Sequence, residues 1–197
     1  MELYLIRHPA VAAAEGLCYG QSDLPLRDPP DSAPFQALLP ELQEVWSSPL
    51  QRCRALAERW QQPLQFDTRL LEVHFGTWEG QPWAALPPAE VNAWMADFVT
   101  ARPPQGESLT DLSVRVCDWL AERRAAERGP LLVITHAGVI RCLVGAVLQL
   151  PLEQVFRLCV DPGSLSRIRL HATDPRFDQL VWLNRPMSAQ TSALDRS

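Results

Sequence analysis

The sequence predicts an α/β fold: a three-layer α/β/α sandwich built around a mainly parallel central sheet. Two observations lead to this prediction. Short apolar runs alternate along the chain with segments of helical periodicity, and their spacing suits parallel strands joined by helices. The length of 197 residues and the hydrophobic content of 47% suit a single domain, expected over residues 1–185, followed by a loosely held polar tail at 186–197.

The first half of the chain holds three predicted strands. Residues 3–6 form an apolar run that Pro9 closes, because proline has no N–H to give to a sheet ladder. A loop of small and turn-forming residues fills 10–34. The elements expected after this loop are a helix at 35–42, a strand at 44–46, a helix at 50–60 and a short strand at 64–67.

The second half is irregular over residues 68–107 and then alternates again. Ser108 and Asp111 stand at the start of a run of helical periodicity and predict a capped helix there. The other expected elements are helices at 89–98 and 138–148 and strands at 131–135, 155–160, 165–170 and 180–183.

The charge of the chain limits its partners. A net charge of −5 argues against nucleic-acid binding, which relies on a basic surface. All 18 basic residues are arginine, so the chain has neither a P-loop lysine nor a Schiff-base lysine. Any bound phosphate would therefore be held by arginine forks and backbone N–H groups.

Cysteine and histidine usage points to a metal-free protein. Five cysteines without Cys-x-x-Cys spacing predict reduced thiols in a cytoplasmic protein, rather than disulfides or a zinc site. The four histidines are scattered, so no metal site and no cofactor are predicted. No apolar stretch approaches the roughly 18 residues of a membrane span, and the N-terminus has no signal-peptide pattern.

Polar residues stand where two apolar strands end. Arg7 and His8 follow the first strand, and His136 follows the strand at 131–135. Ligands of open α/β sheets bind outside the carboxyl ends of the strands, so these residues are candidates for chemistry. A third group, which ends in Arg52, opens the helix at 50–60. Cations and helix N-termini together favour a phosphate ligand.

Five motifs in this order resemble the histidine phosphatase superfamily, also called phosphoglycerate mutase-like, over the chain to about residue 183. They are Arg7-His8, Ser48-Pro49-x-x-Arg52, Leu-x-Glu72 with Gly-x-Trp-Glu79-Gly, Gly-Glu107-Ser, and Thr135-His136-Ala137-Gly138. The resemblance implies a metal-independent phosphomonoesterase that acts on a small-molecule phosphate ester through a phosphohistidine. Nucleic-acid and membrane partners are not expected, while apolar residues in the final strands are compatible with a homodimer.

The resemblance also assigns roles to individual residues. His8 resembles the nucleophile, with its second ring nitrogen expected to donate to the carbonyl of the next residue, here Pro9. Glu72 resembles the proton donor, and Glu79 is its close rival. The residues that the resemblance assigns to substrate binding are Arg7, Arg52, His136, Gly20 and Ala137.

The substrate's alcohol is predicted from two further segments. Pro9 after His8, together with the later run Cys18-Tyr19-Gly20, resembles the α-ribazole phosphatase branch of cobalamin synthesis. Residues 80–105 contain Arg102 as their only basic residue, which disfavours the alternative of a phosphoglycerate mutase. Their aromatic residues suit an apolar alcohol, and we expect Trp83 or Trp94 to face the pocket. A broad-specificity sugar or nucleotide phosphatase is the other alternative.

Overall fold

A six-stranded sheet forms the centre of the protein, whose computed structural model describes residues 1–13, 15–126 and 129–186. The strand order is β3 (Leu64–Phe66), β2 (Glu44–Ser47), β4 (Leu131–Thr135), β1 (Glu2–Arg7), β5 (Leu165–Arg169) and β6 (Gln179–Arg185). The first four of these strands are parallel to one another. Strand β5 runs antiparallel to both of its neighbours, β1 and β6. The prediction of a mainly parallel sheet is confirmed.

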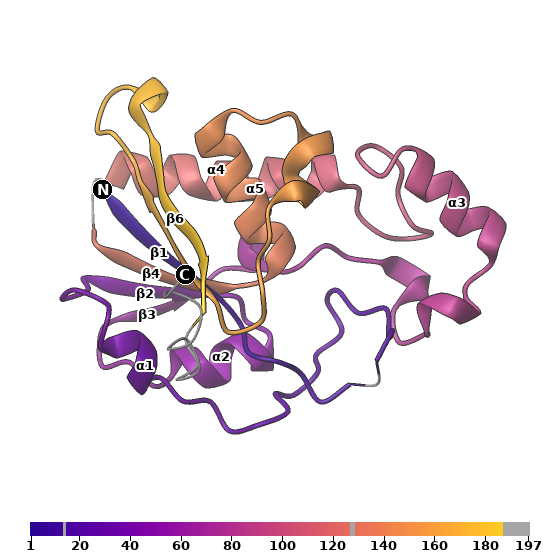
Figure 1. Cartoon of the computed structure of the whole chain (residues 1–197), viewed down its shortest axis with the longest axis horizontal. Helices are drawn as coiled ribbons and strands as arrows, with labels where there is room; N and C mark the ends of the chain where they lie inside the picture. Colours follow the sequence, from indigo (N-terminus) through magenta and orange to yellow (C-terminus); the bar gives the residue numbers. More distant parts are fainter. Residues whose placement is uncertain (14, 127–128, 187–197) are drawn as a thin grey trace, which may run out of the picture.

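Helices cover both faces of the sheet, as predicted (Figure 1). Alternate residues of a strand point to opposite faces, so β1 contributes to two cores. Leu3 and Leu5 pack with α4 (Leu109–Ala126) and α5 (Ala137–Leu148). Tyr4 and Ile6 pack on the other face with α1 (Ala33–Gln36) and α2 (Gln51–Ala57). The hydrophobic burial on these two faces fixes the strand ends that carry Arg7 and His8.

The segment between β3 and α4 extends away from the sheet (Figure 1). It contains the short 3-10 helices η1 (Thr68–Leu70), η2 (Gly76–Trp78) and η3 (Trp83–Ala85), followed by α3 (Pro88–Ala96). A small separate core of Cys18, Trp78 and Leu86 holds this excursion together. The excursion is therefore a lobe beside the carboxyl ends of the strands, where a substrate would enter.

The prediction of a strand at 155–160 is wrong. Residues Leu152–Arg157 form the 3-10 helix η4 instead. Val155 of this helix is buried against Gly145 of α5, where a Cβ would lie 2.9 Å from Val155 Cγ1. The apolar residues of this segment therefore cover α5 and do not extend the sheet.

The predicted helix at 35–42 is shorter and earlier than expected, at Ala33–Gln36. Pro34 favours the first turn, and Pro40 cannot continue a helix that would need its N–H. The helix predicted at 50–60 ends at Ala57, and that predicted at 89–98 covers Pro88–Ala96. Residues 187–197, most of the predicted tail, lie outside the described residues.

The capped start of α4 is confirmed. Asp111 N donates to Ser108 Oγ at 3.1 Å, and Ser108 N donates to Asp111 Oδ2 at 2.9 Å. These reciprocal bonds use N–H groups that a helix start leaves without intrahelical partners. The strand predicted at 131–135 is also confirmed, with all five residues buried.

Candidate active site

His8 lies directly after β1 with its ring tautomer fixed. Its Nδ1 lies 2.7 Å from the carbonyl oxygen of Pro9, as the family resemblance implies. Because a carbonyl only accepts hydrogen bonds, Nδ1 carries the proton and Nε2 keeps its lone pair. A neutral imidazole with a bare Nε2 is the form that a nucleophile requires.

The surroundings of His8 keep its ring neutral. The side chain is 3% exposed. Burial, and then the positive charges of Arg52 and Arg7, lower the pKa of His8 to about 3, although the Pro9 carbonyl acts in the opposite direction. The His8 ring is therefore a neutral imidazole near neutral pH.

His136, which precedes α5, lies beside His8 with 5.1 Å between the ring centroids. It is fully buried, and its Nδ1 accepts from Arg52 Nε at 3.3 Å. Its Nε2 therefore carries the proton and donates to Ser48 Oγ at 2.8 Å. Burial, followed by the charge of Arg52, holds the pKa of His136 well below its usual value. Both histidines are consequently neutral.

Arg52 extends from the first turn of α2 into the same buried space. Besides His136, it donates to the carbonyl oxygens of Gly20 at 2.5 Å and Ser22 at 2.7 Å. Its guanidinium lies over the ring of Tyr19, 5.5 Å from the centroid. The loop around Tyr19 therefore fixes the orientation of this arginine fork.

Gly20 and Ala137 are placed differently from the other predicted binding residues. Gly20 is packed so tightly that a Cβ would lie 1.9 Å from the carbonyl oxygen of Val73. Its carbonyl oxygen accepts a hydrogen bond from Arg52, so Gly20 supports the position of this guanidinium. The Ala137 side chain packs in the core, which leaves its backbone N–H as the group that could contact a ligand.

Arg7 is the second cation of the group. Its Nη1 donates to the carbonyl oxygen of Val160 at 2.6 Å. Among the residues that the structure describes, its buried Nε has no hydrogen-bond partner. We use the name polar centre for Arg7, His8, Arg52 and His136 together. It combines two neutral imidazoles and two permanent cations.

Glu72 belongs to the loop between η1 and η2, and its carboxyl group lies beside the N-terminus of α5. Its Oε2 accepts from Gly138 N at 3.1 Å, and its Oε1 accepts from Val73 N at 3.0 Å. A Cβ on Gly138 would lie 2.2 Å from Glu72 Oε1, so only glycine allows the carboxyl group this position. The carboxyl group borders a cavity, described below, and can serve a leaving group there.

Glu79, the rival of Glu72, supports the loop instead. It accepts from the backbone N–H groups of Gln21, Ser22 and Phe75 at 2.6–3.0 Å. Burial alone would raise the pKa of Glu79, but hydrogen bonds from the Ser22 hydroxyl and these backbone groups hold it below its usual value. Glu72 lines the cavity described next and Glu79 is not among its lining residues, so the geometry favours Glu72.

A cavity of about 380 Å³ opens beside Glu72. Its walls come mainly from aromatic and aliphatic side chains of the excursion, and both Trp83 and Trp94 face it, which confirms that prediction. We use the name aromatic cavity for it; the aromatic residues that line it are Tyr19, Phe75, Trp83, Trp94, Phe98 and Phe156. Tyr19 also touches Arg52, so the aromatic cavity adjoins the polar centre.

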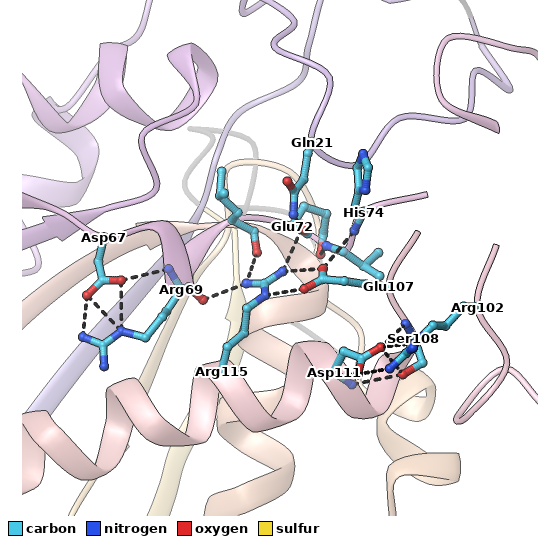
Figure 2. A network of polar contacts seen from close by, with 12 residues as sticks. Gln21, Asp67, Arg69, Glu72, His74, Arg102, Glu107, Ser108, Asp111 and Arg115 are labelled. Atoms are coloured by element: carbon cyan, nitrogen blue, oxygen red, sulfur yellow. Dashed lines mark hydrogen bonds and ion pairs between the residues drawn. The ribbon is translucent and has the colours of Figure 1, made fainter. Parts of the chain in front are cut away.

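Two arginines near the site were not predicted from the sequence. Arg141 of α5 lines the aromatic cavity, donates from Nε to the carbonyl oxygen of Leu158 at 3.0 Å, and lies over the Phe156 ring. Arg115 of α4 donates to the carbonyl oxygen of Glu72 at 2.9 Å and pairs with Glu107 (Figure 2). Arg141 follows the Thr-His-x-Gly motif by three residues, which places it one helical turn along α5. No comparable signal marks Arg115.

Within residues 1–13, 15–126 and 129–186, no three His, Cys, Asp or Glu side chains come together in a way that could hold a metal ion. Among the helices described, none combines the length and apolar character needed to cross a bilayer.

Comparison with known proteins agrees with this geometry. The family model of the histidine phosphatase superfamily (branch 1) matches residues 3–183. A curated relative from Shigella boydii serotype 18, named "Probable phosphoglycerate mutase GpmB", is 33% identical over 93% of this chain and 88% of its own length. The chain therefore belongs to the histidine phosphatase superfamily, branch 1.

Solved structures give the same fold and more than one named activity. The α-ribazole phosphatase from Shigella flexneri superposes with a TM-score of 0.81 at 28% identity, covering 93% of this chain and 96% of that one. A mycobacterial glucosyl-3-phosphoglycerate phosphatase gives a TM-score of 0.76 at 27% identity, covering 93% and 98%. These names differ in the alcohol attached to the phosphate.

Proposed function

We propose that this protein is a metal-independent phosphomonoesterase that forms a phosphohistidine on His8. One observation carries the proposal. A buried, neutral histidine with a fixed tautomer lies beside two arginines, and Glu72 lines an adjoining cavity. Phosphoryl transfer depends mostly on positioning and on stabilising charge, and these groups supply both.

In the first step, the lone pair of His8 Nε2 attacks phosphorus, and the bond between phosphorus and the ester oxygen breaks. Arg7 and Arg52 stabilise the charge on the other phosphoryl oxygens, and the buried N–H of Arg7 Nε suits such an acceptor. His136 can turn its Nε2–H from Ser48 toward the same oxygens. Glu72 gives its proton to the departing alkoxide, because an alkoxide is a poor leaving group.

In the second step, the Glu72 carboxylate accepts a proton from water as the water oxygen attacks phosphorus. The bond between phosphorus and Nε2 then breaks, inorganic phosphate leaves, and His8 and Glu72 return to their starting forms.

We further propose α-ribazole 5′-phosphate, or the corresponding cobalamin 5′-phosphate, as the substrate. The aromatic cavity supports this choice, because a benzimidazole would stack between Trp83 or Trp94 and the neighbouring rings. The Shigella flexneri relative, named an α-ribazole phosphatase, also supports it. The distinctive loop around Tyr19 connects this cavity to the polar centre.

A second candidate is an ester whose alcohol carries a carboxylate. Arg141 supports it, because this cation lines the aromatic cavity and could bind a second anionic group. Relatives named phosphoglycerate mutase and glucosyl-3-phosphoglycerate phosphatase fit such an ester. Arg102 does not contribute here, since it pairs with Asp111 on the surface.

A substrate panel tests both proposals. The panel contains α-ribazole 5′-phosphate, 3-phosphoglycerate, fructose bisphosphate and p-nitrophenyl phosphate, with kcat/KM measured for the wild type and for Arg141→Gln. We expect the highest kcat/KM for the ribazole ester and release of inorganic phosphate. A preference for 3-phosphoglycerate that Arg141→Gln removes would favour the second candidate. Isomerisation of the glycerate without phosphate release would contradict the hydrolase assignment.

A further inference from the structure

The segment that carries Glu72 lacks regular secondary structure of its own. It runs between η1 and η2, so its backbone does not exchange hydrogen bonds with a neighbouring strand. Buried carbonyl groups need partners, and a loop without them would be mobile. The position of the Glu72 carboxyl group therefore depends on contacts from outside the loop.

Arg115 supplies these contacts from the middle of α4 (Figure 2). Its Nη1 donates to the carbonyl oxygens of Arg69 at 2.8 Å and Leu71 at 2.7 Å, and its Nη2 donates to that of Glu72 at 2.9 Å. One guanidinium thus holds three carbonyl groups over four residues. A lysine ammonium is compact and lacks the planar fork, so it cannot reproduce this pattern.

Glu107 completes the support on the other side of Glu72. It accepts from Arg115 Nε and Nη2, both at 2.8 Å, and from His74 N at 3.0 Å. The Arg115 side chain is 18% exposed and that of Glu107 is 23% exposed, so the pair is shielded from most solvent. The pair therefore grips the chain two residues after Glu72 as well as before it.

We propose that Arg115 and Glu107 form a positioning pair that holds the Glu72 carboxyl group in place for proton transfer to the leaving alcohol. This inference rests on the proposed function, because it assigns the pair a role through Glu72. Neither residue needs to touch the reacting phosphoryl group. A displacement of about 1 Å at a catalytic group can cost on the order of 100-fold in rate, so such a pair would be visible in kinetics.

The test is a double-mutant cycle with two esters. Arg115→Lys, Glu72→Gln and the combined variant are compared on the preferred alkyl ester of the panel and on 2,4-dinitrophenyl phosphate, whose leaving group needs no proton. We expect Arg115→Lys to lower kcat/KM, which reports the steps up to departure of the alcohol, by about 10- to 100-fold on the alkyl ester and by less than about threefold on the dinitrophenyl ester. In the Glu72→Gln background the Arg115→Lys effect on the alkyl ester should fall below about threefold.

Two further variants separate positioning from folding. Arg124→Gln is the matched control: Arg124 lies on the same helix, donates to the carbonyl oxygen of His171 and pairs with Asp178, and its side chain is 22% exposed. It should leave the ratio of the two ester rates unchanged. Glu107→Gln keeps the carbonyl contacts of Arg115 and should show a smaller loss with the same ester selectivity, even if Arg115→Lys melts too early to assay.

Two results would overturn the inference, and they can be told apart. In the first, Arg115→Lys and Glu107→Gln each lower kcat/KM equally on both esters, and these losses add to a leaving-group-selective loss in Glu72→Gln. The pair would then only stabilise the fold. A Glu72→Gln variant without any leaving-group selectivity would remove Glu72 as proton donor. That result would refute the proposed function at this residue, and the positioning role with it.

Discussion

The polar centre and the aromatic cavity lie side by side but depend on different parts of the chain. His8 and His136 follow strands in the middle of the sheet, and their backbones are tied together by a bond of 2.9 Å from His8 N to the carbonyl oxygen of Thr135. The aromatic cavity is built largely from the excursion, whose elements are short 3-10 helices and α3. The sheet therefore positions the candidate nucleophile and the two cations, whereas the residues that would contact the alcohol belong largely to the excursion, which also carries Glu72.

The largest expected effect concerns the polar centre. Arg52→Ala removes a cation beside His8 and leaves the carbonyl groups of Gly20 and Ser22 without this donor. We expect kcat/KM to fall by about 1000-fold, and by a similar factor for every ester, because the phosphoryl group is common to all of them. Arg54→Ala, on the exposed side of the same helix, is the control and should be nearly neutral.

Steady-state kinetics on the panel, with circular dichroism to check folding, would measure this effect. A loss of kcat/KM confined to esters whose alcohol carries an aromatic ring would contradict the separate roles of the two regions. Arg52 would then act mainly through Tyr19 of the aromatic cavity, over which it lies.

The next effect concerns the boundary between the two regions. Gly138→Ala places a Cβ where Glu72 Oε1 lies, so the carboxyl group must move. We expect kcat/KM on alkyl esters to fall by about 100-fold, with a much smaller loss on a dinitrophenyl ester. Gly145→Ala on the same helix meets only Val155 and should alter stability without this ester selectivity. An unchanged kcat/KM in Gly138→Ala would show that Glu72 has no required position.

A smaller and more selective effect is expected in the aromatic cavity. Trp94 faces Trp83 with 6.1 Å between ring centroids and an interplanar angle of 27°. Trp94→Ala should raise KM by about 10-fold, corresponding to roughly 1.4 kcal/mol, for an ester whose alcohol carries an aromatic ring. The KM for glycerol phosphate should stay unchanged. Trp182→Ala, which removes a tryptophan packed on the opposite face of the sheet, is the matched control. Equal losses on both esters would show that Trp94 supports the fold only.

A further effect is one of pH on stability, and it arises in the polar centre. The pKa of His8 is about 3 in the folded protein against 6.5 as its ordinary value. The unfolded chain therefore binds a proton that the folded chain rejects as pH falls from 6.5 toward 3, so His8 lowers stability in that window. Between pH 7 and pH 5 this amounts to at most about 2 kcal/mol.

Urea unfolding at pH 7 and pH 5 measures this difference. His8→Asn should lose less stability than the wild type on acidification, while His171→Asn, at an exposed position, controls for the exchange itself. An identical pH dependence in wild type and His8→Asn would contradict the neutral, buried state of His8.

The sequence predicts the polar centre well because each of its residues lies within a few positions of a strong local signal. His8 and His136 follow apolar strands, and Arg52 opens a helix after Ser48-Pro49. The carboxyl ends of parallel strands meet at one edge, so the fold brings these residues together once the sheet is known. The Pro9 carbonyl as partner of His8 follows instead from the family resemblance, and the structure places it 2.7 Å from His8 Nδ1.

The supports of the site could not be predicted in this way. Arg115 is an ordinary residue of a long amphipathic helix, and its partners at Arg69 and Leu71 are more than 40 positions away. Contacts of this kind depend on how the excursion packs, which propensity and periodicity do not describe. The prediction of a strand at 155–160 is wrong for a related reason. A short apolar run has the same pattern whether it forms a strand or a 3-10 helix that packs on α5.

The most direct test of the phosphohistidine at His8 is a rapid acid quench of the wild type mixed with a ³²P-labelled ester. Phosphohistidine is labile in acid, so the quench is followed at once by transfer to base and peptide mapping. The expected result is a base-stable label on the peptide that contains His8, absent from His8→Asn. Turnover and labelling that survive in His8→Asn, or a label on His136, would contradict the assignment.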